Sequence, residues 1–339
     1  MIYEVEFATG LIDIVREEVR QVIGKKGHII GSYRDDSLQF TYKDDKVALL
    51  DLKTVIAVYH VVQFDIPRPK ALLGHEHFHK LLGVIQPLLD VEQYQSLYLS
   101  AAGSESSVMM RIKTELSDYL KLSIAEDEGD LLLRMRRTPK TVQGWDVLVR
   151  LTPRPLATRD WRVCNYEGAL NASVASALIT LTNPTPDDRF LNIGCGSGTI
   201  MIERQQQAPA KLIMGCDISE DALYCSRLNI KEANINTIQL LDSDAIQLPL
   251  ADASIDKLVA DLPFGYLSGS HDENEWLYPA ILSESARVAQ RGATFVIITH
   301  EVRLIESILD STIEWRLMAE PLKITLSGLH PRIYLLERQ

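Results

Sequence analysis

The sequence predicts an α/β protein whose C-terminal part is a doubly wound domain on a mostly parallel, seven-stranded sheet, preceded by an α+β region. Two observations predict this class. After residue 159, apolar runs of strand length alternate regularly with helical segments, which is typical of successive β-α-β units. Before it, short strands and amphipathic helices follow one another less regularly. The 339 residues leave room for two or three domains, and we expect them at 1–65, 66–158 and 159–339.

The first 158 residues predict two small units of sheet and helix. In the first unit, apolar residues at helical spacing predict a helix over 11–23, and alternating patterns predict strands at 2–8, 28–33, 38–42 and 54–66. The second unit has the same composition, with helices over 75–89 and 108–122 and strands at 96–101, 130–137 and 145–153. A connector with prolines and polar residues, 153–163, then leads into the second part of the chain.

The second part predicts a parallel sheet from five apolar runs with helices between them. These runs lie at 189–193, 211–218, 237–241, 255–260 and 294–299. The carboxyl ends of such strands form one edge, and open α/β sheets bind their ligands there. We therefore examined the residues that follow each strand.

Composition and the N-terminus indicate a globular chain without a membrane segment. No apolar run is long enough to span a bilayer, and the first ten residues carry acids where an export signal needs basic residues. No Cys-x-x-Cys pair occurs, which favours reduced thiols over disulfides or a zinc site at Cys164, Cys195, Cys216 and Cys225. His75, His77 and His79 alternate along a helix rather than share a face. We therefore expect a cytoplasmic protein with no metal, and we favour a monomer.

The basic residues are concentrated in one segment, although the net charge is −11. Residues 131–165 hold eight basic and two acidic side chains, a local balance of +6. Such a stripe could follow a phosphate backbone, because guanidinium groups grip phosphate oxygens. A solvated strand face that balances the acidic run 126–130 is the other interpretation, and on charge alone it stays open.

A glycine loop follows the first strand of the C-terminal part, in "FLNIGCGSGTIMIE", 190–203. Gly194, Gly196 and Gly198 allow a sharp turn and close approach of a ligand, and a helix is expected to begin near Thr199. Dinucleotide sites need Gly-x-Gly-x-x-Gly, whereas the third glycine here comes one residue earlier. The spacing Gly-x-Gly-x-Gly is usual for S-adenosylmethionine sites, and tight packing is the alternative explanation.

Two acids at later strand ends support a cofactor site. Asp217 ends the second strand, 23 residues after Gly194, where an acid can bind two ribose hydroxyls. Asp244 follows the third strand, where a carboxylate could accept a hydrogen bond from an adenine amino group. Either acid alone would more often cap a helix. The glycine loop, Asp217 and Asp244 follow three successive strands, and together they favour a cofactor site over separate helix caps.

The fourth strand ends in "DLPFG", 261–265. Asp261 can accept a hydrogen bond from an exocyclic amine, and Pro263 lacks an N–H, which leaves the neighbouring carbonyls as acceptors. Phe264 offers a ring face, and stacking a base on such a ring contributes about 1–3 kcal/mol. Two acceptors that hold both amino hydrogens would direct the nitrogen lone pair at a methyl donor. A simple turn with a buried Phe264 is the alternative.

The combination of "GCGSGT" and "DLPFG" resembles the THUMP-domain RNA methyltransferases, particularly those that methylate N2 of a guanine in tRNA. The catalytic motif of that family has five positions: Asn or Asp; Leu, Pro or Met; Pro; Tyr or Phe; and Gly. Residues 261–265 match all five. The segments 159–163, 165–181 and 327–338 also resemble the family. Over 1–158 the similarity is architectural, with a ferredoxin-like unit at 1–65 and a THUMP domain at 66–158.

The resemblance implies a Rossmann-like methyltransferase domain at 159–339 with S-adenosylmethionine as cofactor and tRNA, bound near its acceptor end, as partner. The catalytic residues implied are Asp261, Leu262, Pro263 and Phe264. The cofactor-binding residues implied are Asn171, Asn192, Gly194, Gly196, Ser197, Gly198, Thr199, Asp217, Ile218, Asp244, Ala245 and Asp261. Candidates for RNA contact are Arg134, Arg136, Arg137, Lys140, Arg154, Arg159 and Arg162.

One position departs from the family. The family usually has an acid at the end of the first strand, and this chain has Asn192, which accepts hydrogen bonds but carries no charge. A catalytically inactive RNA-binding protein is therefore one alternative to tRNA guanine-N2 methylation. The other is an N-methyltransferase that acts on rRNA, DNA or protein, because the acidic C-terminal domain carries no obvious track of basic residues for phosphates.

Overall fold

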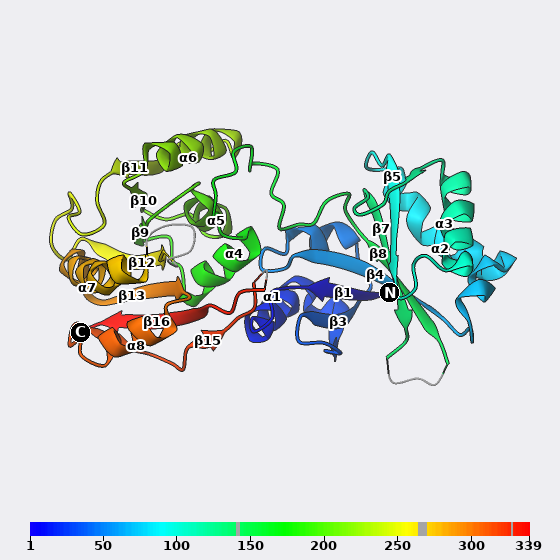
Figure 1. Ribbon diagram of the computed structural model, residues 1–339, viewed down its shortest axis with the longest axis horizontal. Helices are drawn as coiled ribbons and strands as arrows, with labels where there is room; N and C mark the ends of the chain where they lie inside the picture. Colours follow the sequence, from blue (N-terminus) through cyan, green and yellow to red (C-terminus); the bar gives the residue numbers. More distant parts are fainter. Residues whose placement is uncertain (140–142, 264–269, 327) are drawn as a thin grey trace. The chain divides into compact units, whose positions relative to one another are not determined.

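The computed structural model (Figure 1) describes residues 1–139, 143–263, 270–326 and 328–339, which form two compact units. The first unit comprises Met1–Phe7 and Val15–Leu156, and the second comprises Ala8–Ile14 and Ala157–Gln339. Strands from both predicted N-terminal domains join a single sheet. The boundary at residue 65 and the THUMP assignment stay predictions.

The first unit is built on an eight-stranded sheet in the order β2-β3-β1-β4-β8-β7-β5-β6. Neighbouring strands are antiparallel except at β5, which runs parallel to both β7 and β6. The strands are β1 (Ile2–Glu6), β2 (Gly27–Gly31), β3 (Ser37–Tyr42), β4 (Ala57–Phe64), β5 (Ser96–Ala101), β6 (Ser123–Ile124), β7 (Leu131–Arg137) and β8 (Trp145–Arg150). The predicted strands of this part are thus confirmed, within a few residues at each end.

Helices in the first part of the chain follow their apolar spacing. The α-helices are α1 (Ile12–Ile23), α2 (His75–Leu89) and α3 (Ser107–Leu120), and short 3-10 turns are η1 (Gly24–Lys26), η2 (Lys46–Asp51) and η3 (Pro69–Leu73). Ser106 caps α3 by accepting a 3.4 Å hydrogen bond from the Met109 N–H. The helix ends where Lys121 adopts the left-handed conformation, with φ of 58°.

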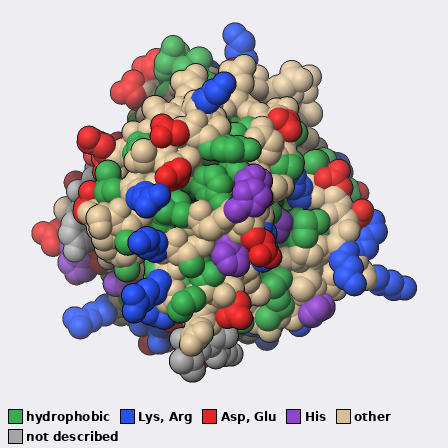
Figure 2. All heavy atoms as spheres, turned by 90° about the vertical axis from the view of Figure 1, so that its right-hand side faces the viewer, with side chains coloured by type: hydrophobic (Ala, Val, Ile, Leu, Met, Phe, Trp, Pro, Cys, Tyr) green, Lys and Arg blue, Asp and Glu red, His purple; other side chains and the backbone are tan. Residues whose placement is uncertain are grey.

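Figure 2 shows a face of the first unit on which histidine side chains lie among apolar and charged ones. His75 and His79, one turn apart at the start of α2, stack with ring centroids 4.1 Å apart. In the described part of the chain, no three His, Cys, Asp or Glu residues are grouped so that they could hold a metal ion.

The second unit contains a sheet in the order β11-β10-β9-β12-β13-β16-β14, with β15 also paired to β16. Its first five strands are parallel, and β16 and β14 are antiparallel to their neighbours. The strands are β9 (Arg189–Ile193), β10 (Leu212–Asp217), β11 (Ile238–Asp242), β12 (Ile255–Asp261), β13 (Ala289–Thr299), β14 (Trp315–Leu317), β15 (Leu322–Lys323) and β16 (Arg332–Arg338). This confirms the predicted Rossmann-like, mostly parallel sheet, but the described residues give it eight strands instead of the expected seven, because the short β15 also pairs with β16.

Helices connect these strands, and apolar residues at the sheet centre form the core. The helices are α4 (Ala172–Leu181), α5 (Thr199–Gln207), α6 (Glu220–Glu232), α7 (His271–Val288) and α8 (Val302–Leu309) (Figure 1). Leu258, Val259 and Ala260 of β12 are completely buried, because a central parallel strand is covered on both faces. The carboxyl ends of β9, β10, β11 and β12 therefore lie along one edge.

The expectation of four reduced thiols is wrong for two of them. Cys164 and Cys225 form a disulfide, 61 residues apart in sequence, while Cys195 and Cys216 are free and buried. The chain brings Cys164, the residue after the connector, against Cys225 of α6, a proximity that Cys-x-x-Cys spacing alone does not reveal. Among the described residues, no helix is both long enough and apolar enough to span a membrane.

Candidate functional site

The glycine loop turns sharply between β9 and α5. Gly194, Gly196 and Gly198 all have positive φ angles, of 62°, 52° and 83°, a conformation that side chains disfavour. A Cβ at Gly198 would lie 2.9 Å from Oγ of Ser226, so this turn needs glycine for packing as well as for φ. The loop thereby presents its backbone to the strand-end edge of the sheet.

Asp217 and Ser226 fix the loop from neighbouring elements. Asp217 Oδ2 accepts a 2.8 Å hydrogen bond from the Gly196 N–H, and its Oδ1 accepts one of 3.0 Å from the Ser219 N–H. Ser226 of α6 donates its hydroxyl to the Gly196 carbonyl at 2.7 Å. The Asp217 carboxylate is thus held in place at the end of β10, where the sequence predicted a ribose ligand.

A cavity of about 810 Å³ opens at this edge of the sheet. It brings together residues from the ends of four strands, β9 to β12. The predicted residues that line it are Gly194, Gly196, Ser197, Thr199, Asp217, Ile218, Asp244, Ala245, Asp261, Leu262 and Pro263. Most of the predicted cofactor and catalytic residues therefore share one cavity of a size usual for small-molecule sites.

Three predicted cofactor residues do not line the cavity. Asn171 caps α4 by accepting the Ser173 N–H at 2.9 Å. Asn192 is completely buried, and its amide donates to the Val259 carbonyl at 3.2 Å. Gly198 packs against Ser226, as described above. The predicted Phe264 lies outside the described residues, as does Gly265 of the same motif.

Asp261 ends β12 at the cavity wall. Its Oδ1 is shielded from solvent and has no hydrogen-bond partner among the described residues. A carboxylate oxygen that is shielded from water and has no partner makes ionisation costly, and desolvation accordingly raises the pKa of Asp261 to about 7. A carboxyl that is only half ionised near neutral pH is ready to accept a hydrogen bond or a proton from a ligand.

The carbonyl of Pro263 is held by two side chains of α7. Asn274 donates to it at 3.1 Å and Tyr278 at 2.7 Å, and the Tyr278 hydroxyl also lies 2.7 Å from Oγ1 of Thr299. Asn274, Tyr278 and Thr299 are all completely buried. The Pro263 carbonyl is therefore engaged inside the protein, and α7 fixes the corner that follows Asp261.

Sequence reasoning missed three segments of the cavity wall. They are residues 166–170, which follow the connector, one face of α7 (Glu273, Trp276, Leu277 and Ile281), and Leu326 and Leu329. Residues 166–170 belong to the segment 165–181, which resembles the family. The α7 residues carried no motif, and their common face appears only once the helix is placed after β12.

The chain just before residues 166–170 is anchored by Asn229 of α6. Its Oδ1 accepts the N–H groups of Val163 and Cys164 at 3.0 and 2.9 Å. Its amide donates to the carbonyls of Cys164 and Ser197, both at 3.0 Å. Together with the disulfide, these bonds hold the connector against the glycine loop.

The arginines predicted to contact RNA in the first unit make internal contacts. Arg134 pairs with Glu6 at 2.9 Å and lies over the Tyr59 ring. Arg136 donates to both carboxylate oxygens of Glu4, at 2.8 Å for one of them. RNA contact by these two side chains stays a prediction, and their pairs account for much of the charge counted along β7.

Arg137 differs from its neighbours on β7. It is exposed and lies over the Trp145 ring, with 5.2 Å between the guanidinium and the ring centroid. Arg154 is also exposed, and Lys140 lies outside the described residues.

The two arginines of the connector hold the second unit together. Arg159 is nearly buried and forms two hydrogen bonds with Glu203, of 2.7 and 3.0 Å. Arg162 donates to the Leu170 carbonyl and to Oγ1 of Thr199, both at 2.9 Å. RNA contact by these side chains stays a prediction, while their observed contacts brace the cavity wall and the start of α5.

The residues of the cavity fit S-adenosylmethionine. Asp217 and Asp244 are carboxylates at neighbouring strand ends, suited to hydroxyl and amine donors. Ile218 is 73% exposed beside Asp217 and offers an apolar surface for a base. The unpaired N–H groups at the start of α5, beside the glycine loop, suit a carboxylate. Each chemical part of the cofactor thus has a matching group.

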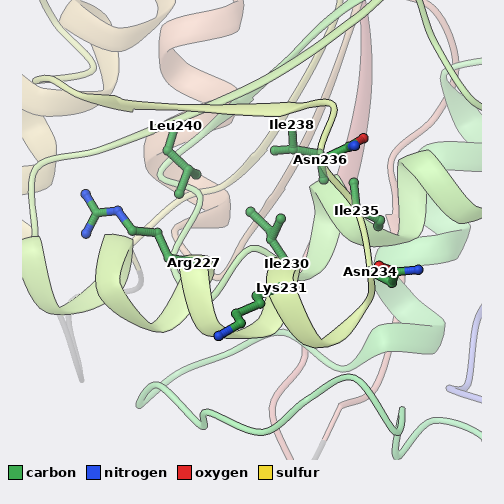
Figure 3. Close-up of a pocket in the computed structure, with 8 residues that line it drawn as sticks. All are labelled: Arg227, Ile230, Lys231, Asn234, Ile235, Asn236, Ile238 and Leu240. Carbon is green, nitrogen blue, oxygen red and sulfur yellow. The ribbon is translucent and has the colours of Figure 1, made fainter.

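A second, smaller hollow of about 400 Å³ lies against α6 and β11 (Figure 3). Ile230, Ile235, Ile238 and Leu240 make its wall apolar, and basic side chains of α6 flank it. It shares no lining residue with the larger cavity, and no acidic, thiol or imidazole group lines it within the described chain. The larger cavity is therefore the candidate active site.

Two proteins of related sequence are named as tRNA guanine-N2 methyltransferases. A mouse protein named tRNA (guanine(6)-N(2))-methyltransferase THUMP3 is 30% identical over 184 residues, which cover 50% of this chain and 36% of the relative. A tRNA (guanine(6)-N2)-methyltransferase of Methanocaldococcus jannaschii is 24% identical over 257 residues, covering 64% of this chain and 66% of the relative. The chain thus spans between about a third and two thirds of the length of these relatives.

Solved structures share the fold over the whole chain. TrmN from Thermus thermophilus superimposes with a TM-score of 0.77 at 20% identity, covering 100% of this chain and 99% of that one. SMU.472, described as a putative methyltransferase complexed with SAH, gives 0.69 at 15% identity, with 100% and 98% covered. The model of one family, described as RMKL-like, methyltransferase domain, matches residues 159–331, about half of the chain. The chain therefore belongs to the RMKL-like methyltransferase family, and residues 159–331 are its methyltransferase domain.

Proposed function

We propose that the chain is an S-adenosylmethionine-dependent methyltransferase that modifies the exocyclic N2 of a guanosine in tRNA. The observation that carries the proposal is the unpartnered, shielded Oδ1 of Asp261 in the wall of the cavity that also contains the glycine loop. The names of the relatives in mouse and Methanocaldococcus support the guanine-N2 reaction.

Strand-end residues would hold the cofactor. S-adenosylmethionine supplies an electrophilic methyl group when it is bound. Asp217 accepts hydrogen bonds from its ribose hydroxyls, and Asp244 from its adenine amine. Ser197 and Thr199 lie at the start of α5, where unpaired N–H groups receive its carboxylate. Ile218 covers one face of the adenine.

Asp261 positions the acceptor. Its carboxylate accepts a hydrogen bond from the N2 amine of a guanine flipped into the cavity, and the Leu262 carbonyl accepts the other amine hydrogen. The nitrogen lone pair then forms the bond to the methyl carbon, the sulfur keeps the electrons of the bond that breaks, and one proton leaves N2. Asp261 takes up that proton. Alignment supplies most of the rate effect.

Both units would contact the tRNA. In this proposal the first unit binds near the acceptor end, and exposed basic residues such as Arg137 and Arg154 contact phosphates. A cytoplasmic monomer remains the expected form of the protein.

The test is methylation of RNA transcribed without modifications. Unmodified tRNA is incubated with the protein and deuterium-labelled S-adenosylmethionine, and its nucleosides are separated by mass spectrometry. We expect labelled N2-methylguanosine. Label in rRNA, DNA or protein but not in tRNA would favour another acceptor. Absence of cofactor binding in calorimetry would favour an inactive RNA-binding protein and overturn the proposal.

A further inference from the structure

We propose that Glu273 and Trp276 of α7 select guanine, with Glu273 accepting the N1–H of the flipped base and Trp276 covering one of its faces. This inference rests on the proposed function and deepens it, since it assigns the specificity for guanine to residues outside the family motif. Both side chains line the cavity that contains Asp261 and the glycine loop.

Helix geometry places Glu273 and Trp276 beside the backbone corner that follows Asp261. Asn274 and Tyr278, on the same two turns of α7, hold the Pro263 carbonyl at 3.1 and 2.7 Å. Residues three and four positions apart lie on one face of a helix, so Glu273, Trp276 and Leu277 form the neighbouring strip, which faces the cavity. The strip therefore begins within one helical turn of the residues that fix the corner after Asp261.

Both side chains expose their functional groups. Trp276 is 57% exposed, which is unusual for an indole in a soluble protein. The Glu273 side chain is exposed and forms no hydrogen bond or ion pair with the described residues. Its position in the first helical turn also suits the helix dipole. The dipole does not explain why Glu273 borders the cavity while Asp272, in the same turn, does not.

Two leucines near the C-terminus add apolar surface to the cavity wall. Leu326 and Leu329 exchange two backbone hydrogen bonds of 2.9 Å each. Both side chains line the cavity, and Leu329 is 44% exposed. Together with Trp276 and Leu277 they add apolar surface to the cavity, and Glu273 and Asp261 are two of the acids that line it.

The hydrogen-bond donors of guanine match the carboxylates of Asp261 and Glu273. Its Watson–Crick edge presents N1–H and N2–H₂ side by side as donors, and enzymes read a flipped base at this edge. Adenine presents an acceptor at N1, which a carboxylate would repel. With Asp261 on the N2 amine, Glu273 is the acceptor for N1–H, and the stacking surface of Trp276 is indifferent to the identity of the base.

The experiment replaces the target base by 2-aminopurine, which keeps the N2 amine but has an acceptor at N1. The modified guanosine is first located in unmodified tRNA transcripts with the wild-type protein. Ligated tRNAs then carry guanosine or 2-aminopurine at that position. We expect the wild type to prefer guanosine in kcat/KM by about 10- to 100-fold, the usual effect of losing a hydrogen bond to a charged group.

Glu273→Gln gives the decisive comparison. The glutamine amide donates to N1 of 2-aminopurine, so the preference for guanosine should fall to within about threefold. 2-Aminopurine also lacks O6 of guanine. This loss affects the wild type and Glu273→Gln alike, so it cancels when the preferences of the two proteins are compared. Glu275→Gln is the matched control, because it removes the same charge from α7 at a residue that pairs with His271 at 3.8 Å and does not line the cavity. It should keep the wild-type preference.

Trp276→Leu tests the stacking surface. We expect KM for tRNA to rise about 5- to 150-fold, Trp276→Phe to recover most of the loss, and the calorimetric Kd for S-adenosylmethionine to stay unchanged. A matching rise in the cofactor Kd would assign Trp276 to the cofactor and overturn its role here.

An unchanged guanosine preference in Glu273→Gln would overturn the role of Glu273. Failure of the wild type to methylate any guanosine-containing tRNA would instead overturn the proposed function itself.

Discussion

Charged side chains in two regions of this chain have opposite surroundings. The arginines of the basic segment, such as Arg136 and Arg159, are paired inside the protein with Glu4 and Glu203. Asp261, at the end of β12, has a shielded carboxylate oxygen with no partner among the described residues. Charge that is already paired contributes to the fold, while a buried charge without a partner is retained at a cost and marks the place where a ligand can supply the missing interaction.

Removing the unpartnered carboxylate should have the largest effect on activity. Asp261→Ala is expected to lower kcat by about 10³-fold, within the range of general acid–base catalysts. The Kd for S-adenosylmethionine should change less than threefold, since Asp217 and Asp244 are the acids that we propose as its ligands. Methyl transfer is followed with radioactive cofactor, and calorimetry gives the Kd. Full activity of the variant would remove Asp261 from the mechanism.

Removing a paired charge should instead destabilise the fold. In Glu203→Gln the guanidinium of Arg159, itself only 9% exposed, loses a two-bond partner. We expect the free energy of unfolding to fall by about 3–5 kcal/mol, as when one partner of a buried pair is removed. Urea denaturation followed by circular dichroism measures this change.

An exposed pair provides the control for that variant. Glu337 pairs with Arg316 on neighbouring strands, and their side chains are 30% and 59% exposed. Glu337→Gln should therefore cost less than about 1 kcal/mol. Equal losses in the two variants would mean that burial does not decide the stability of ion pairs in this unit.

The raised pKa of Asp261 predicts a pH dependence. With the pKa at about 7, the carboxylate acceptor is lost as the pH falls below 7, so kcat/KM should drop about tenfold per pH unit there. Protonation is favoured in the folded state relative to an ordinary carboxyl near 3.8. The contribution of Asp261 to stability should therefore be most favourable below about pH 4 and decline as the pH rises from about 4 to about 7.

Asp261→Asn separates this effect from the titration of other groups. The variant has no carboxyl to ionise, so the wild type should lose stability relative to it over that pH interval. Thermal unfolding of both proteins at pH 5 and pH 8 measures the difference. Parallel curves for the two proteins would mean that Asp261 ionises normally.

The sequence allowed the parallel sheet and the strand-end residues to be predicted, because Gly194, Asp217 and Asp261 each follow an apolar strand at the edge where α/β sheets bind ligands. It could not show that Arg159 is paired with Glu203, since the two are 44 residues apart. Nor could it reveal the face of α7 that borders the cavity. Charge counts along a segment do not distinguish an exposed cation from one with a buried partner.

Tyr278 tests whether the fixed position of the corner after Asp261 matters. Tyr278→Phe removes the 2.7 Å hydrogen bond to the Pro263 carbonyl but keeps the ring. We expect kcat to fall about 10-fold, as the loss of one buried hydrogen bond costs about 1–2 kcal/mol, with an unchanged Kd for the cofactor. Tyr334→Phe is the matched control, because it removes a hydroxyl that bonds Glu306 at 3.3 Å in the same unit. It should lower stability slightly and leave kcat unchanged.

Arg137 and Arg136 offer the finest comparison, since they are neighbours on β7 with different partners. Arg136 is bound by Glu4, whereas Arg137 is exposed over Trp145 and forms no ion pair with the described residues. If Arg137 contacts a phosphate, Arg137→Gln should reduce the slope of log K against log salt concentration by about 0.7–0.9, the release of one counterion. Fluorescence anisotropy of labelled tRNA at several salt concentrations measures the slope.

Arg136→Gln should leave the slope unchanged and instead lower the stability of the first unit, because Glu4 keeps its charge and loses its partner. Equal slopes for the wild type and Arg137→Gln would mean that Arg137 does not contact the RNA.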